Sequence, residues 1–233
     1  MSQRNFLKKF KQIIELLTLV GCIYRDYYLE VVYLKQNVKH SYEPIIGIWV
    51  KAKPEYIETF IENWENTKQV QAFCVYDVPP ILPEGGLVFL HAINLNRLMA
   101  YAEYVGYEYI EGWYEHVRIK NDTIWIKERE RIWNTYGPNR LHTHDKEEFN
   151  DFWEAQKGVR GLFLMRNIFT VTKRVTWDES MKILQVSRPV GFSYKYLTIS
   201  QVQKFLQLID VKMEIKVQGI TSPKVILKPI INL

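Results

Sequence analysis

The chain has only two cysteines among its 233 residues, Cys22 and Cys74, and it lacks any apolar run of about 18 residues. Two cysteines cannot build a disulfide framework, and this pair does not have the spacing of metal ligands. The missing apolar run gives no reason to expect a transmembrane helix. We therefore expect a cytoplasmic protein that has no membrane partner.

Signatures of catalysis are also scarce, since the chain has no phosphate-binding glycine loop and no nucleophile elbow. The one metal-like cluster is His142-Thr143-His144-Asp145. Its two histidines, His142 and His144, resemble the paired histidines of rolling-circle replication nucleases, which implies a metal-dependent nuclease or a replication initiator. In the structural alternative, Asp145 caps the helix that follows. We favour this alternative and expect neither an enzyme nor a cofactor.

What the sequence does contain is a strong asymmetry of charge. Residues 41–123 include 6 basic and 12 acidic residues, for a net charge of −6. Residues 156–233 include 13 basic and 4 acidic residues, for a net charge of +9. Such a division is typical of a protein in which one part binds a polyanion. A lysine-rich surface that is merely solvated has the same composition.

Residues 1–40 carry a heptad stripe of apolar residues from Phe6 to Leu34. This spacing predicts a helix that pairs with a copy of itself, and therefore a homodimer. Two alternatives remain open. Residues 23–34 are rich in Tyr and Val and also fit a strand. Leu19-Val20-Gly21-Cys22 resembles a bacterial lipoprotein cleavage site, although Glu15 interrupts the apolar stretch before it.

Residues 41–123 have a pattern that predicts strands and helices in the order βαββαβ. The expected elements are strands at 45–53, 71–78, 86–92 and 107–120, with helices at 55–66 and 95–105. Ile48-Trp49-Val50-Lys51-Ala52-Lys53-Pro54, followed by an acidic helix, resembles the start of the ligand-sensing domain of the leucine-responsive (Lrp/AsnC) regulators. Over residues 43–120 this resemblance implies a ferredoxin-like fold that dimerises and binds a small effector, here unknown.

Residues 124–233 are expected to form a basic, winged-helix-like domain. The expected elements are helices at 145–156, 176–184 and within 187–209, with strands at 161–171, 211–217 and 224–230. Capping boxes, Asp145 with Glu148 and Thr176 with Glu179, start the first two helices. Over residues 145–231 this order is that of a winged helix-turn-helix, and residues 176–197 resemble the helix-turn-helix of bacterial and archaeal regulators.

The resemblance implies a set of contacts to double-stranded DNA. The nucleic-acid-binding residues would be Lys173, Arg174, Arg188, Ser193, Tyr194, Lys195, Lys216, Lys224 and Lys228. Arg188 would pair with guanine, whereas the lysines would neutralise phosphates. In an alternative assignment residues 187–197 form a loop, and Gln201, Gln203 and Lys204 of a helix at 198–209 face the groove.

The sequence therefore predicts an α+β protein with an N-terminal helix, a ferredoxin-like module and a winged-helix end. The predicted function is sequence-specific DNA binding, as a homodimeric transcriptional regulator without a cofactor. The competing hypotheses are a nuclease that uses His142 and His144, and an interaction protein with a basic face.

Overall fold

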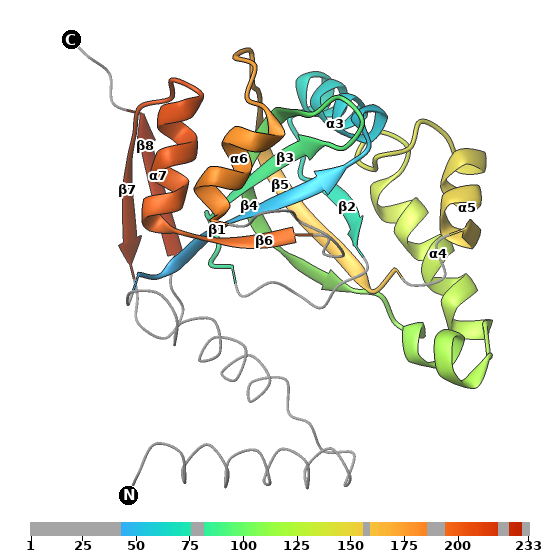
Figure 1. Cartoon of the computed structure of the whole chain (residues 1–233). Coiled ribbons are helices and arrows are strands. Elements are labelled where there is room, and N and C mark those ends of the chain that lie inside the picture. Colours follow the sequence, from blue (N-terminus) through green and yellow to red (C-terminus); the bar gives the residue numbers. More distant parts are fainter. Residues whose placement is uncertain (1–42, 76–81, 156–158, 186–193, 219–223, 230–233) are drawn as a thin grey trace, which may run out of the picture. The chain divides into compact units, whose positions relative to one another are not determined.

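The structure, a computed structural model, describes residues 43–75, 82–155, 159–185, 194–218 and 224–229. The chain from Pro44 onward forms one compact unit (Figure 1). The helical, dimer-forming segment expected at residues 1–40 lies outside the described residues, so the homodimer stays a prediction. Among the described helices, none combines the length and the apolar character that crossing a membrane requires.

A six-stranded mixed sheet lies at the centre of this unit, with the strand order β2-β5-β4-β3-β1-β6. The strands are β1 (Ile45–Ala52), β2 (Gln71–Val75), β3 (Leu87–Ala92), β4 (Arg97–Tyr109), β5 (Gly161–Thr170) and β6 (Tyr194–Thr198). Strands β1 and β3 are parallel, and the other four pairings are antiparallel. The sheet curls: the ring of Tyr194 in β6 lies 5.7 Å from that of Phe163 in β5, although three strands lie between β5 and β6 in the sheet order.

Helices cover both faces of the sheet. They are α3 (Pro54–Thr67), the π-helix η1 (Glu115–Ile119), α4 (Thr123–Tyr136), α5 (Lys146–Ala155), α6 (Trp177–Leu184) and α7 (Ile199–Leu208). On one face, Phe60 of α3 shares a core with Ile48 of β1. On the other, Phe205 of α7 stacks on Phe89 of β3, with 4.8 Å between the ring centroids. Helices α4 and α5 pack around Leu162 in a third core, which also includes residues of β2 (Figure 1).

A second, two-stranded sheet consists of the hairpin β7 (Met213–Gln218) and β8 (Lys224–Pro229). Its inward side chains, such as Ile215 and Leu227, pack against the core beneath α6 and α7. Two contacts attach β8 to the loop before β3. The backbone N–H of Val225 donates to the carbonyl of Glu84 at 2.8 Å, and Lys224 Nζ lies 2.8 Å from the carboxylate of Glu84.

The ferredoxin-like module is not what the structure shows. Residues 95–105, expected as a helix, lie mostly in β4, and the strand expected at 107–120 is divided between the end of β4 and η1. The first half of β4 is buried on both faces of the sheet. The successive residues from Leu98 to Ala102 are all apolar and all buried. A strand buried on both faces has no alternating pattern, and its apolar residues also match helical spacing. The resemblance to the Lrp/AsnC domain was therefore wrong.

The winged-helix prediction was also wrong, although several of its elements are present. Helices α5, α6 and α7, strand β5 and the β7–β8 hairpin lie close to their predicted positions. However, β5 pairs with β2 and β4, and β6 pairs with β1, within the central sheet. Residues 194–197, expected at the end of a recognition helix, belong to β6. These pairings join segments far apart in the sequence, and local periodicity carries no information about them.

Candidate nucleic-acid interface

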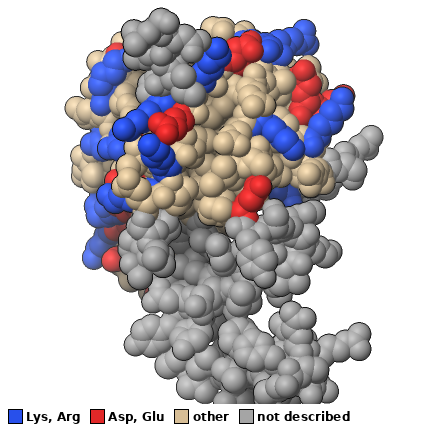
Figure 2. All heavy atoms as spheres, turned by 90° about the vertical axis from the view of Figure 1, so that its left-hand side faces the viewer, with Lys and Arg blue, Asp and Glu red and all other residues tan. Residues whose placement is uncertain are grey.

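Charge is segregated in space as well as in sequence. Within residues 159–229, the described segments contain 11 basic and 4 acidic residues, whereas those within 43–155 contain 11 basic and 18 acidic residues. Helices α6 and α7 and the β7–β8 hairpin lie together at one side of the sheet, and α4 and α5 lie at the opposite side (Figure 1). Figure 2 faces the first side, where Lys and Arg side chains cover more of the surface than Asp and Glu side chains do.

Capping boxes position both helices of this basic side. At the start of α6, the backbone N–H of Thr176 donates to the Glu179 carboxylate at 2.8 Å, and Thr176 Oγ1 accepts from the Glu179 N–H at 3.4 Å. Thr198 and Gln201 make the same reciprocal bonds at the start of α7. The first box was predicted; the second was missed, although Thr-x-x-Gln is a known form of the motif.

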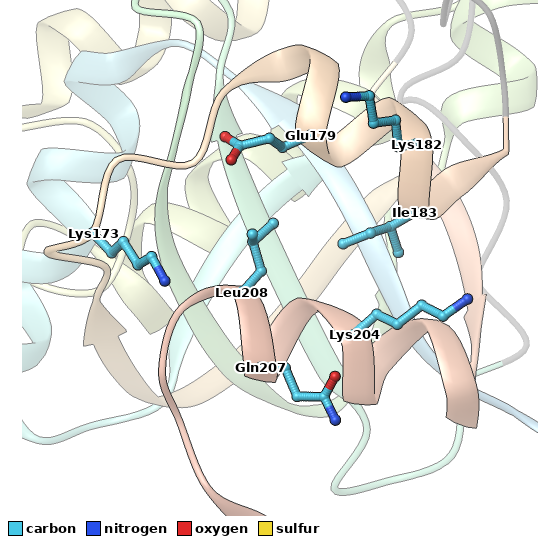
Figure 3. A pocket seen from close by; sticks show the side chains of 7 residues that line it. All are labelled: Lys173, Glu179, Lys182, Ile183, Lys204, Gln207 and Leu208. Carbon is cyan, nitrogen blue, oxygen red and sulfur yellow. The ribbon is translucent and has the colours of Figure 1, made fainter.

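An open hollow of about 430 Å³ lies between α6 and α7 (Figure 3). The residues that line it are Lys173, Glu179, Lys182, Ile183, Lys204, Gln207 and Leu208. The side chains of Ile183 and Leu208 extend into the space between the two helices, and the charged side chains surround them (Figure 3). Gln201 of α7 joins the two walls, because its Nε2 donates to the carbonyl of Ile183 at 3.1 Å.

The hollow has a net positive charge once its ion pairs are taken into account. Lys173 Nζ lies 2.9 Å from the Asp210 carboxylate. The Glu179 carboxylate accepts the hydrogen bonds of the helix cap, chiefly from the Thr176 backbone, and these bonds lower its pKa and keep it charged. In the described part of the chain, Lys182 and Lys204 have no carboxylate within 4.0 Å. These two ammonium groups are therefore available to an anion.

The other predicted DNA-contacting residues that the structure describes do not line the hollow. Lys216 pairs with Glu214 at 3.0 Å, and Tyr194 packs its ring against Phe163 and Tyr196. Lys195 lies on β6, one of the two edge strands of the sheet, and Lys224 pairs with Glu84. Arg174 and Lys228 are exposed. Arg188 and Ser193 lie outside the described residues.

Only part of the hollow was predicted. Sequence reasoning named Lys173 and, in the alternative assignment, Lys204, but it missed Lys182. The sequence feature that could have identified Lys182 is its position three residues after Glu179, on the exposed face of a helix with a capping box. Gln201, also in the alternative set, is used by the α7 cap.

The two histidines of the metal-like cluster lie in different surroundings. His142 is only 1% exposed, and its ring contacts Tyr56, Phe73 and Phe152 at centroid distances of 4.7, 5.5 and 4.4 Å. This burial lowers the pKa of His142 to about 3, so the imidazole is neutral. His144 Nε2 instead lies 3.2 Å from Thr59 Oγ1. Across the described ranges, no three His, Cys, Asp or Glu side chains come together as a metal site.

No family model matches the sequence. A search of curated proteins also finds no match.

Three solved structures are similar to this one at a low level. The ASCH protein of Zymomonas mobilis is 13% identical, with a TM-score of 0.49, and the alignment covers 70% of this chain and 95% of that one. A hypothetical protein from Leishmania major is 11% identical (TM-score 0.41; 72% and 96% covered). The human THYN1 protein, in complex with DNA containing 5-methylcytosine, is 10% identical (TM-score 0.40; 71% and 98% covered). None of the three is named as a winged-helix or Lrp/AsnC regulator, and at these scores none defines the fold or function of this chain.

Proposed function

We propose that this protein binds nucleic acid through the surface formed by α6, α7 and the β7–β8 hairpin. The observation that carries the proposal is a set of exposed cations on these elements and on the loops next to them. In the described ranges, five of them have no carboxylate within 4.0 Å: Arg174, Lys182, Lys204, Lys212 and Lys228. We call these five residues the basic surface.

The hairpin extends the positive charge beyond the helices. In its register, Glu214 is opposite Lys228 and Gln218 is opposite Lys224. Because side chains alternate along a strand, one face of the hairpin carries Lys212, Lys216, Lys224 and Lys228, with Glu214 as its acidic residue. The opposite face is apolar and packs on the same core as α6 and α7. The two helices and the hairpin therefore form one continuous layer.

The cations of the basic surface are spread over several elements, and such a distribution suits a polymer of phosphates better than a single small anion. Each lysine that approaches a phosphate releases condensed counterions, and this release favours binding at low salt. Contacts of this kind position a nucleic acid without selecting its sequence. The recognition helix was the basis of the regulator hypothesis, and it is absent from residues 194–198. We therefore propose nucleic-acid binding without sequence-specific regulation, and leave duplex preference and the homodimer as predictions.

The test is fluorescence anisotropy of the full chain with a labelled duplex and a labelled single strand at several salt concentrations. We expect the logarithm of the association constant to fall linearly with the logarithm of salt concentration. The double variant Lys212→Ala/Lys228→Ala should reduce the magnitude of that slope by about 2, roughly 1 for each lost phosphate contact.

The matched control is Lys53→Ala/Lys127→Ala, which removes the same charge from exposed positions before α3 and on α4. It should leave the slope close to that of the wild type. Absence of binding at low salt, or an equal loss in the control variant, would refute the proposal.

A further inference from the structure

The hollow between α6 and α7 combines an apolar surface with unpaired cations. Ile183 and Leu208 are half-buried, so part of each side chain remains accessible inside the hollow (Figure 3). Lys182 and Lys204 come from the two opposite walls, and in the described part of the chain neither has a carboxylate partner. A purely electrostatic contact to a polymer backbone does not need the apolar surface. That surface therefore points to a ligand that has an apolar part as well as negative charge.

The size of the hollow restricts that ligand. A volume of about 430 Å³ falls within the range of sites that hold one small molecule. The ligand must carry negative charge for the two lysines and an apolar face for Ile183 and Leu208. Gln207 adds an amide, which both donates and accepts hydrogen bonds, as heteroaromatic rings and sugars require.

We infer that this hollow binds a single nucleoside monophosphate. The base lies on Ile183 and Leu208, and the phosphate pairs with the ammonium groups of Lys182 and Lys204. A free mononucleotide and the 5′-phosphorylated end of a strand share this chemistry. The choice of a nucleotide among phosphate monoesters rests on the proposed function. The hydrogen bond from Gln201 Nε2 to the Ile183 carbonyl joins the two walls, so the site exists before the ligand arrives.

The test is isothermal titration of the full chain with adenosine 5′-monophosphate, with adenosine and with inorganic phosphate. We expect the nucleotide to bind about tenfold or more tightly than either fragment, since only the nucleotide uses both parts of the hollow. Lys182→Ala/Lys204→Ala should weaken nucleotide binding about tenfold or more, because two charge-assisted contacts are lost. Ile183→Gln should weaken binding of the nucleotide but leave that of inorganic phosphate unchanged.

The control variant is again Lys53→Ala/Lys127→Ala, and thermal unfolding of each variant confirms that it is folded. Competition by 5′-phosphorylated and 5′-hydroxyl oligonucleotides distinguishes the two sources of the ligand: stronger competition by the phosphorylated strand assigns the hollow to strand ends, and equal competition assigns it to free nucleotides.

Two results separate this inference from the proposed function. If wild-type protein fails to bind the mononucleotide, or binds it as tightly as Lys182→Ala/Lys204→Ala does, the inference is wrong even when strand binding persists. If the mononucleotide binds but neither strand nor duplex does, the proposed function is wrong and the hollow stands as a mononucleotide site.

Discussion

Replacing the buried His142 by leucine tests how the fold responds to acid. The folded chain holds this imidazole neutral, because burial lowers its pKa to about 3. In the unfolded chain a histidine titrates near pH 6.5. Between these two pH values only the unfolded state binds the proton. The contribution to the free energy of unfolding is therefore fully present above about pH 6.5 and declines as the pH falls toward 3.

The magnitude follows from the two pKa values of each buried histidine. For His142, lowering the pH from 7.5 to 5 reduces the free energy of unfolding by about 2 kcal/mol. His91 is also fully buried, and its pKa is lowered by burial to about 4, so it adds about the same amount. We expect the free energy of unfolding of the wild type to fall by about 4 kcal/mol between pH 7.5 and pH 5 because of the two histidines. That of His142→Leu should fall by only about half as much.

Urea unfolding followed by tryptophan fluorescence at pH 7.5 and at pH 5 measures this difference. Ile132→Val is the matched control, because it removes one methyl group from the core that also contains Phe152, a ring in contact with His142. It should lower the free energy of unfolding by about 0.5–1.5 kcal/mol at both pH values. If the wild type and His142→Leu lose the same free energy between the two pH values, the reasoning is refuted.

Two further predictions concern the sheet and the capped helix. An added Cβ at Gly161 would lie 2.2 Å from the Tyr107 ring, so Gly161→Ala should cost about 1–3 kcal/mol in thermal unfolding. Gly106→Ala, whose Cβ meets nothing within 4 Å, should cost much less, and equal losses would contradict the steric argument. Thr176→Ala removes the N-cap of α6 and should cost about 0.5–2 kcal/mol by urea unfolding, whereas the same change at exposed Thr172 should be nearly neutral.

Sequence reasoning was most accurate where the deciding interactions are local. Helix α3, predicted at 55–66, spans Pro54–Thr67, and three of its buried residues, Pro54, Ile57 and Phe60, follow a single face. Helix α6 was found through its capping box, which satisfies backbone groups within one turn. The β7–β8 hairpin was found because its strands are adjacent in sequence and alternate in polarity.

Prediction failed where the environment is made by distant segments. Strand β4 is covered on both faces for part of its length, and its neighbours β3 and β5 come from residues 87–92 and 161–170. The candidate site shows the same division. The charge asymmetry was visible in composition, but the presence of both Lys182 and Lys204 at one hollow depends on the packing of α6 against α7.

The attachment of β8 at Glu84 has a consequence for the length of nucleic acid that the proposed function would favour. Because a main-chain hydrogen bond and an ion pair secure the hairpin, its lysines sit at a set offset from the helices. Under the proposed function, a strand long enough to span that offset would contact the hairpin lysines and the lysines of α6 and α7 together, and the second contact would form at high effective concentration. A shorter fragment would contact only one of these two groups of lysines at a time. Affinity should therefore rise abruptly, rather than smoothly, once oligonucleotides exceed the bridging length.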